Sequence, residues 1–364
     1  MTLALKKTQP ETKPDKKKLS IFLAGIGAVG GTLLEQIRNL DHPQYDLEII
    51  GFCNSRFTCW EPDAEQLNDP TNICCGAKTD WDSIPKKILD RADRDLVFVD
   101  ATGSENVARV YHDLLQHGIH IATPSKLANT FEQEYFDTLE KTCNDHNSHY
   151  RYETAVGAGL PVVGTIKTLL NSGDEITKIA GVVSGTMTYL FNQLEAGVSF
   201  SESVKNAKTN GYSEPDPRDD LSGEDVARKF LILARISGYE FEREKIRVDS
   251  LVPENLISLT TDEFLQKLPD YDSHWKSRNA QALVSNKKLR YVGEFTPDGI
   301  SVGVSEVKSD SPLSHLKGTD NLIQIYTRRY SDSPIVIQGP GAGKEVTAAG
   351  VLGDIIDIGG LVKG

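Results

Sequence analysis

Short apolar runs alternate with amphipathic segments over the first 150 residues of the chain. Leu19–Ala24 and Leu47–Phe52 are apolar runs of strand length, and Thr32–Leu40 between them has apolar residues at helical spacing. Two later runs of the same kind are Asp95–Asp100 and Ile119–Ala122. Strands that alternate with helices are typical of a parallel sheet covered on both faces. The pattern therefore predicts an α/β fold that begins with a doubly wound parallel sheet.

The regular alternation ends near Val156. Pro161 suits the first position of a helix that runs through Leu169, and Val346–Ile358 predicts a final helix. Four further strands interleaved with helices are expected at Ile179–Val183, Ile246–Val248, Lys288–Gly293 and Ile300–Val304. The chain is therefore expected to divide into a tail (1–18), a first domain (19–155), a second α+β domain (156–338) and a C-terminal segment (339–364).

The turn after the first strand is rich in glycine and reads Gly25, Ile26, Gly27, Ala28, Val29 and Gly30. Gly25 suits the tight turn, Gly27 lets the backbone approach a pyrophosphate, and Gly30 lets the next helix pack closely on the strand. The N-terminus of that helix offers unpaired N–H groups and a positive dipole end to phosphates. Because strand, turn and helix follow in this order, a Rossmann-like dinucleotide site is favoured over a structural glycine turn.

Polar residues follow the other predicted strands at their carboxyl ends, where ligands collect in open parallel sheets. Asn54 and Arg56 stand where an NAD-specific fold usually has an acid. With no carboxylate to repel a 2′-phosphate, NADP(H) should be accepted, although an ordinary surface role for Arg56 is equally open. The residues expected at the cofactor beyond the later strands are Thr102, Gly103, Ser104 and Lys126. Because Lys126 is a single lysine after a strand, the alternative is that it is an ordinary solvent-exposed side chain.

The segment Gly211–Lys229 concentrates titratable groups on locally rigid backbone. Pro215 and Pro217 restrict the residues before them, so Glu214 and Asp216 are held in extended geometry. Such crowding of carboxylates indicates a polar site, without indicating which reaction it serves.

A helix is expected after these prolines, with Ser222 as its N-cap and Gly238 at its end. Asp225 would occupy the third helical position and share a face with Lys229, one turn later. A pair of this kind is most often a surface ion pair that contributes roughly 0.3–0.5 kcal/mol. The neighbouring carboxylates favour a functional role, because a lysine among carboxylates can be tuned for proton transfer.

Together these motifs resemble homoserine dehydrogenase, and in particular the dehydrogenase portion of the bifunctional aspartate kinase–homoserine dehydrogenases. The resemblance covers the chain from about Leu19 to its C-terminus. Its most specific part is the Glu-Pro-Asp-Pro-Arg-Asp-Asp-Leu core of Gly211–Lys229. The supporting motifs are Gly25–Gly30, Lys126–Asn129, Val156–Pro161, Ser184–Thr186 and Gly339–Gly353.

The resemblance implies a role for each matching position. Substrate binding is implied for Glu214, Asp220, Asp225, Gly185 and Thr186, and catalysis for Lys229, Lys126 and Asp225. Gly343 matches a position where the C-terminal segment returns to the cofactor. A monovalent cation, Na⁺ in the first instance, is implied at Glu153, Val156, Ala158 and Leu160. The glycines around Val156 could be mistaken for a second phosphate loop, but no typical apolar strand leads into them, so a cation site or a turn is preferred.

The implied activity is the NAD(P)-dependent interconversion of L-aspartate 4-semialdehyde and L-homoserine, by a homodimer whose second domain serves catalysis and dimerisation. This reaction belongs to threonine, methionine and isoleucine biosynthesis. Neither the kinase domain nor the regulatory domain of the bifunctional enzymes is expected within these 364 residues, which puts threonine feedback through such domains in doubt. Two alternatives remain: another Rossmann-type amino acid or semialdehyde dehydrogenase, and a non-catalytic NADP-binding sensor.

Composition limits the possible partners. The net charge is −12 and the sequence pI about 5.2, so a basic surface for nucleic acid is not expected. The mean hydropathy is −0.34 and no apolar run has spanning length, so no membrane helix is expected. Met1–Lys18 lacks an apolar core and is expected to be a mobile tail rather than a signal peptide.

Cysteine and histidine positions indicate neither a disulfide framework nor a metal site. An odd number of cysteines without a C-x-x-C pair fits a reducing cytoplasm; they are Cys53, Cys59, Cys74, Cys75 and Cys143. Cys143 lies in a charged helical pattern, which argues against a thiol nucleophile. His146 and His149 are expected to face solvent, because nothing nearby completes a set of metal ligands.

Overall fold

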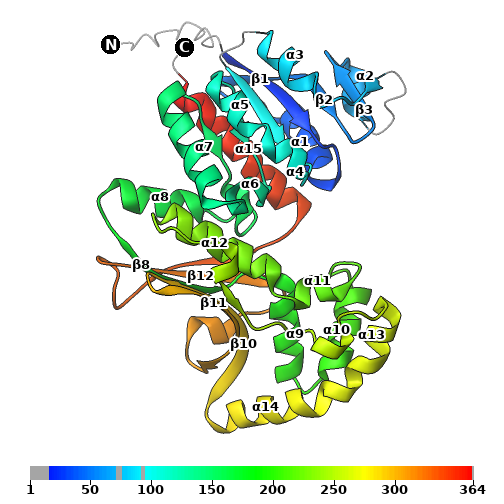
Figure 1. The fold of residues 1–364 in the computed structure, drawn as a ribbon, viewed down its shortest axis with the longest axis vertical. Helices are drawn as coiled ribbons and strands as arrows, with labels where there is room; N and C mark the ends of the chain where they lie inside the picture. The colour runs from blue at the N-terminus through cyan, green and yellow to red at the C-terminus, as the bar shows by residue number, and fades with distance from the viewer. Residues whose placement is uncertain (1–15, 71–75, 92–94, 363–364) are drawn as a thin grey trace, which may run out of the picture.

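The computed structural model describes residues 16–70, 76–91 and 95–362. These residues form a seven-stranded sheet and a six-stranded sheet, stacked one below the other along the long axis of the molecule (Figure 1). The α/β class and the two-part organisation expected from the sequence are both present.

The first sheet has the strand order β4-β3-β2-β1-β5-β6-β7, and β2, β1, β5, β6 and β7 run parallel. Its strands are β1 (Lys17–Ala24), β2 (Tyr45–Cys53), β3 (Phe57–Trp60), β4 (Ala77–Lys78), β5 (Leu96–Asp100), β6 (His120–Ala122) and β7 (Tyr150–Arg151). The helices around it are α1 (Ala28–Asn39), α2 (Ala64–Asn68), α3 (Ile84–Leu89), α4 (Glu105–Arg109), α5 (Tyr111–Gln116), α6 (Leu127–Thr130), α7 (Gln133–His146) and α15 (Lys344–Leu361).

Alternate residues of β1 enter the cores on opposite faces of this sheet. Leu19, Ile21 and Leu23 pack with α1 and with the C-terminal helix α15, while Phe22 and Ala24 face the cluster that includes α5 and α7. This period of two is what a strand buried on both faces requires. The last helix of the chain therefore completes the core of the first sheet, and Figure 1 shows α15 in red beside α1.

The second sheet has the order β13-β12-β8-β10-β11-β9. Its strands are β8 (Ile176–Val182), β9 (Arg247–Val248), β10 (Lys287–Thr296), β11 (Gly299–Lys308), β12 (Asp320–Thr327) and β13 (Ile335–Pro340). The helices of this part are α8 (Val163–Asn171), α9 (Gly185–Glu195), α10 (Phe200–Thr209), α11 (Pro217–Leu221), α12 (Glu224–Ile236), α13 (Thr261–Lys267) and α14 (Asp272–Val284). Short 3₁₀ turns are η1 (Glu153–Ala155), η2 (Arg243–Lys245), η3 (Glu254–Leu256), η4 (Leu268–Tyr271) and η5 (Pro312–His315).

Helix α12 lies between the two sheets and packs on β10 and β11 (Figure 1). Phe230 of α12 sits directly over Gly293 of β10, where an added Cβ would come within 2.1 Å of its ring. The close approach of helix to sheet therefore depends on the absence of a side chain at Gly293. Because α12 is held at this junction, its N-terminal turn faces the first domain.

Several element boundaries differ from those expected from the sequence. β1 begins at Lys17, inside the expected tail, whose residues 1–15 lie outside the described part. Pro161 precedes helix α8 instead of starting it, because the carboxylate of Glu153 accepts the first N–H groups of the helix from Val163 and Gly164. Strands β12 and β13 were not expected, since their apolar and polar residues alternate only weakly.

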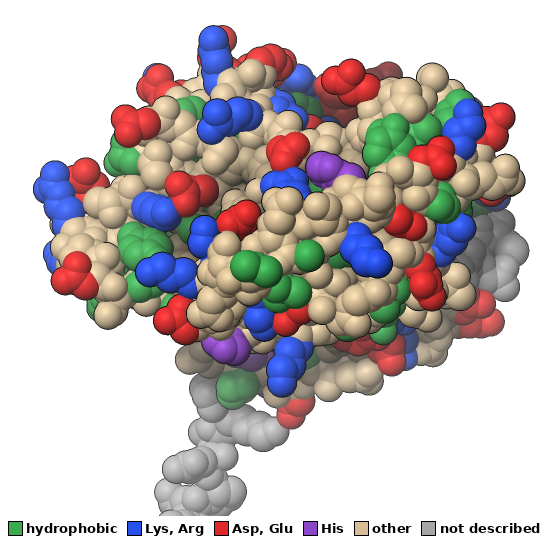
Figure 2. Space-filling view, turned by 90° about the horizontal axis from the view of Figure 1, so that it is seen from below, with side chains coloured by type: hydrophobic (Ala, Val, Ile, Leu, Met, Phe, Trp, Pro, Cys, Tyr) green, Lys and Arg blue, Asp and Glu red, His purple; other side chains and the backbone are tan. Residues whose placement is uncertain are grey.

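The surface at the lower end of the second domain carries acidic and basic side chains interspersed with one another (Figure 2). None of the helices that the structure describes is both long enough and apolar enough to cross a membrane.

Candidate active site

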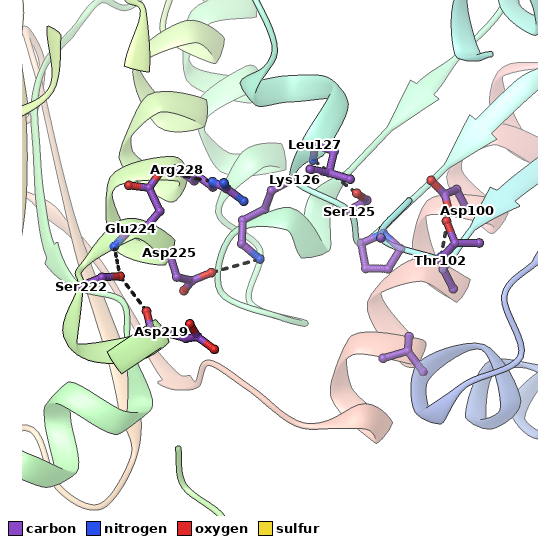
Figure 3. Close-up of a pocket in the computed structure, with 14 residues that line it drawn as sticks. Asp100, Thr102, Ser125, Lys126, Leu127, Asp219, Ser222, Glu224, Asp225 and Arg228 are labelled. Carbon is purple, nitrogen blue, oxygen red and sulfur yellow. Dashed lines mark hydrogen bonds and ion pairs between the residues drawn. The ribbon is translucent and has the colours of Figure 1, made fainter. Parts of the chain in front are cut away.

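Two neighbouring cavities lie where the first domain meets the second. One, of about 610 Å³, lies between the carboxyl ends of β5 and β6 and the first turn of α12 (Figure 3). Its lining includes Val29, Thr102, Gly103, Ser125, Lys126, Asp219, Asp225 and Arg228. It is the cofactor-side cavity, because its floor is the edge of the sheet where a Rossmann-like fold binds its ligands.

The second cavity, of about 530 Å³, is the substrate-side cavity. It is lined by Gly185, Thr186, Glu214, Asp219, Asp220, Asp225, Lys229, Gly343 and several backbone segments. Asp219 and Asp225 line both cavities, so the two spaces adjoin at these carboxylates. The substrate-binding and catalytic residues expected from the sequence thus come together at one junction.

Asp225 is bound by a lysine from each side. Lys229 Nζ lies 2.7 Å from Asp225 Oδ2, and Lys126 Nζ lies 3.3 Å from Asp225 Oδ1. Figure 3 shows Lys126 and Asp225 pointing toward each other across the cavity. Although burial opposes ionisation, Lys229 and then Lys126 hold the pKa of Asp225 well below its usual range. The carboxylate is therefore a permanent anion that orients two ammonium groups.

The two lysines have different surroundings. Lys229 is 8% exposed, and its ammonium also donates to the backbone carbonyl of Val183 at 2.7 Å. Lys126 is half-buried, and this burial is the main cause that lowers its pKa. The attraction of Asp225 opposes the shift, while the charges of Lys229 and Arg228 add to it. Lys126 is thus closer to releasing a proton than an ordinary lysine, as a general acid requires.

Helix α12 begins one residue later than the sequence predicted. Its N-cap is Gly223 with φ +76°, and Ser222 Oγ accepts the N–H of Glu224 at 3.2 Å without being the cap. An added Cβ on Gly223 would lie 1.9 Å from the hydroxyl of Tyr291. The contact with β10, which sequence spacing cannot reveal, therefore decides where the helix starts.

Asp220 and Thr186 organise the floor of the substrate-side cavity. Asp220 accepts the backbone N–H of Glu214 at 2.8 Å and the hydroxyl of Thr186 at 3.0 Å. Burial raises the pKa of Asp220, although these hydrogen bonds oppose the effect. Thr186 also lies 2.6 Å from the carbonyl of Tyr212. Asp220 thus fixes the backbone from which the exposed carboxylate of Glu214 reaches the cavity.

The glycine turn after β1 has the geometry expected of a phosphate-binding loop. Gly25 has φ +91° and would clash with Ala101 if it carried a Cβ. Gly30 allows α1 to pack against Gly25, whose carbonyl lies 1.9 Å from where a Cβ of Gly30 would be. Among the described residues, none lies within 4 Å of a Cβ built on Gly27. The backbone of Gly27 is therefore open to a ligand.

The other predicted cofactor residues lie in the turns that follow β2 and β5. Asn54 Oδ1 accepts the N–H groups of Arg56 at 2.7 Å and Phe57 at 2.8 Å, so its amide shapes the turn and leaves the side chain of Arg56 exposed. The hydroxyl of Thr102 donates to Asp100 at 2.6 Å and accepts the N–H of Ser104 at 3.0 Å. The hydroxyl of Thr102 is therefore engaged by groups of its own loop.

The residues expected to hold a cation surround the start of α8. Both carboxylate oxygens of Glu153 accept N–H groups of α8 at 2.7 Å, and burial raises its pKa. Left-handed residues at Gly157 (φ +82°) and Ala158 (φ +51°) fold the segment back on itself. One carboxylate with several backbone carbonyls is an all-oxygen donor set, and donors of this kind fit a hard monovalent cation.

Arg228 and Asp219 are cavity residues that sequence reasoning did not assign. Arg228 lies one turn after Glu224 and Asp225 on α12, and its side chain enters the cofactor-side cavity beside Lys126 (Figure 3). Helical spacing from Asp225 could have indicated it, since residues three apart share a face.

None of the cysteines and histidines that the structure describes is among the residues lining these two cavities. Cys53 and Cys59 are buried, and burial raises the pKa of the Cys143 thiol to about 11, which fits an unreactive side chain. Cys74 and Cys75 lie outside the described residues. His149 stacks on His120 rather than on His146. Over residues 16–70, 76–91 and 95–362, no three His, Cys, Asp or Glu side chains gather as a metal-binding group.

Comparison with known proteins decides the family. The family model "Homoserine dehydrogenase" matches residues 161–356, and the model "Homoserine dehydrogenase, NAD binding domain" matches residues 25–153. The chain belongs to the homoserine dehydrogenase family. The resemblance seen in the sequence is therefore confirmed, and so is the Rossmann-like fold of the first domain.

Relatives of this family match nearly the whole chain. A homoserine dehydrogenase of Paracoccidioides brasiliensis is 38% identical over 94% of this chain and 98% of its own length. The chloroplastic bifunctional aspartokinase/homoserine dehydrogenase 2 of Zea mays is 39% identical over 94% of this chain, which spans 38% of that longer protein. A solved Candida auris protein of unknown function superposes with a TM-score of 0.89 at 37% identity, covering 95% and 99% of the two chains.

A hyperthermophilic archaeal homoserine dehydrogenase, solved in complex with NADPH, superposes with a TM-score of 0.73 at 24% identity over 95% of this chain and 99% of its own. This likeness shows a shared fold.

Proposed function

We propose that this homoserine dehydrogenase family member interconverts L-aspartate 4-semialdehyde and L-homoserine. The observation that carries the proposal is Asp225, which lines both cavities and holds Lys126 and Lys229. A dehydrogenase needs the substrate carbon beside the nicotinamide and a proton donor beside the substrate oxygen. The junction of the two cavities is the place where both requirements can be met.

The cofactor, when bound, supplies or accepts the hydride at its nicotinamide ring. In the reducing direction, the aldehyde carbon receives the hydride, and its oxygen becomes an alkoxide that takes a proton. Lys126, with its lowered pKa, is suited to give that proton, and Lys229 is suited to stabilise the oxygen as a fixed cation. Asp225 keeps both ammonium groups in place throughout.

The substrate-side cavity suits the amino acid part of the substrate. Glu214 provides a carboxylate for its ammonium group, from a backbone position fixed by Asp220. Gly185 and Thr186 stand at the start of α9, where backbone N–H groups and the helix dipole favour a carboxylate. A site with one group for an ammonium and another for a carboxylate would favour an amino acid semialdehyde over a simple aldehyde.

NADP(H) is proposed to be at least as good a cofactor as NAD(H). The exposed guanidinium of Arg56 follows β2, and the position usually held by an acid is Asn54, whose amide serves the turn. The Arg56→Ala variant should raise the KM for NADPH while leaving that for NADH nearly unchanged. An unchanged KM for NADPH would assign Arg56 to the surface.

A monovalent cation is proposed at Glu153 and the backbone carbonyls of Val156, Ala158 and Leu160. It would tie the connection between the two domains to the start of α8, without taking part in proton transfer. We further propose that the first domain runs from the start of β1 to residue 155, that the second spans 156–338, and that 339–364 return to the first domain. A homodimer and a cytoplasmic location are proposed as well. Light scattering after size exclusion tests the dimer.

The decisive experiment follows NADPH absorbance in the presence of aspartate semialdehyde. Turnover with this aldehyde, and not with simple aldehydes, supports the proposal over another semialdehyde dehydrogenase. NADPH binding without turnover of any aldehyde would favour the sensor alternative.

A further inference from the structure

A buried carboxylate lies beneath the cofactor-side cavity and is not used in the reaction described above. Asp100 ends β5 and is 0% exposed, as is Tyr111, the first residue of α5. Asp100 Oδ1 accepts the N–H of Thr102 at 2.8 Å and its hydroxyl at 2.6 Å, while Oδ2 accepts the hydroxyl of Tyr111 at 2.5 Å. A carboxylate in this environment is retained only with such partners, because its desolvation is costly.

Thr123 connects Asp100 to the next strand end. Its hydroxyl donates to the backbone carbonyl of Asp100 at 2.7 Å and accepts the N–H of Ser125 at 2.9 Å. It also lies 3.3 Å from the hydroxyl of Tyr111. Lys126 is the residue directly after Ser125. The loop after β5 and the loop that carries Lys126 therefore share one hydrogen-bond network.

Both ends of this network reach the cavity. The loop at 101–103 forms part of its wall, and so do Ser125 and Lys126 on the other side (Figure 3). A network needed only for stability could be replaced by apolar packing of similar volume. This network joins the loop at 101–103 to the loop that carries Lys126, and both loops line the cavity.

We propose that Asp100, Tyr111 and Thr123 are positioning residues that lock the cofactor-facing loop to the loop carrying Lys126. The proposal rests on the proposed function, because the position of Lys126 matters only if hydride transfer takes place here. A displacement of about 1 Å at reacting groups can lower a rate by about 100-fold. Loss of one hydrogen bond in this network should therefore affect turnover more than it affects folding.

The test compares Tyr111→Phe and Thr123→Val with Tyr135→Phe. Both test changes remove hydroxyls from the network and keep side-chain volume. The control removes a half-buried hydroxyl of α7 that donates to the carbonyl of Ala108 at 2.7 Å, away from the cavity. We expect the kcat at saturating NADPH and aldehyde to fall about tenfold or more in both test variants, and by less than about twofold in the control. Similar Tm values across the three variants would separate positioning from stability.

Two further measurements complete the test. Asp100→Asn keeps a carbonyl acceptor for Thr102 and should retain much more of the kcat than Asp100→Ala. Tyr111→Phe should also weaken NADPH binding, measured by fluorescence without substrate, by about fivefold or more. Near-normal kcat and NADPH affinity in Tyr111→Phe and Thr123→Val would overturn the proposal. A wild-type protein that binds NADPH without turning over the aldehyde would contradict the proposed function instead, while the NADPH affinity of Tyr111→Phe would still decide the positioning role.

Discussion

At the scale of single residues, the reaction depends on which group of the Lys126–Asp225–Lys229 cluster moves the proton. We expect Lys126→Ala and Lys229→Ala each to lower kcat by about 10²-fold or more, with NADPH binding weakened mainly by the Lys126 change. Asp225→Asn should have the same effect as Lys229→Ala, and the double variant should cost little more than either single one, because the pair acts as a unit. Steady-state kinetics with separately measured NADPH affinity checks this.

A near-normal kcat in Lys229→Ala together with an inactive Lys126→Ala would show that Lys126 alone acts on the substrate oxygen and that Lys229 does not stabilise it. The Asp225–Lys229 pair would then serve to bind substrate and support α12.

Glu214 sets a second prediction at this scale. Its loss of charge in Glu214→Gln removes a charge-assisted hydrogen bond of about 1.5–3 kcal/mol to the substrate ammonium. The KM for homoserine should therefore rise roughly 10- to 150-fold, while the KM for the cofactor stays within about twofold. Glu202→Gln, on the surface of α10, is a control expected to change neither. An unaltered homoserine KM would remove Glu214 from the site.

At the scale of elements, the start of α12 depends on a glycine. Gly223→Ala adds a Cβ 1.9 Å from the Tyr291 hydroxyl at φ +76°. We expect a loss of about 2–5 kcal/mol in unfolding free energy, from about 1–2 for the left-handed backbone and about 1–3 for the overlap. Gly238 has a φ of +87°, and no described atom lies within 4 Å of a Cβ built on it. Gly238→Ala should therefore show only the cost of the left-handed backbone. Urea unfolding measures both, and Tyr291→Phe in the Gly223→Ala background should recover part of the loss.

Helix α11 gives a pH prediction. Asp216 is its N-cap, and the hydrogen bonds and charge of Arg218 lower the pKa of Asp216 to about 2. Because the folded pKa lies below the unfolded one, this stability is present above about pH 4 and is lost as the pH falls toward 2. Asp216→Asn keeps a good cap and removes the charge, so it should cost about 1–2 kcal/mol at pH 7 and progressively less below pH 4.

Urea unfolding at pH 7 and pH 3 tests the prediction for Asp216. Asp298→Asn, in the exposed turn between β10 and β11, should stay within about 0.5 kcal/mol at both. An Asp216→Asn penalty that does not shrink at pH 3 would contradict a charge effect.

At the scale of the whole molecule, the first domain is completed by the end of the chain. Ile355 of α15 is 0% exposed and packs in the core with β1 and α1. Ile355→Ala should therefore lower the unfolding free energy by about 2–5 kcal/mol and weaken NADPH binding, although it lies far in sequence from the glycine turn. Leu361→Ala, on the exposed end of the same helix, should cost about 0.5 kcal/mol or less. Differential scanning calorimetry and NADPH titration measure both effects, and an Ile355→Ala protein as stable as Leu361→Ala would contradict this packing.

The sequence by itself determined the local secondary structure. The strands and helices around Gly25–Gly30, the acidic segment at Gly211–Lys229 and the final helix are all visible in residue spacing, because burial on a strand or helix imposes a fixed period. The resemblance to the family assigned most cavity residues for a related reason. The charged groups lie on short, locally rigid stretches of backbone, so their order along the chain is enough to recognise the motif.

Contacts between distant segments were decided only by the tertiary structure. The joining of Lys126 to Asp225, the start of α12 against Tyr291, and the capping of α8 by Glu153 each bring together groups that sequence spacing does not relate. The same holds for the hydrogen bonds that Tyr111 and Thr123 donate to Asp100, which join a strand to a helix and one strand end to the next. Such contacts depend on how sheets and helices pack, and packing is a property of the whole chain, whereas periodicity belongs to each element alone.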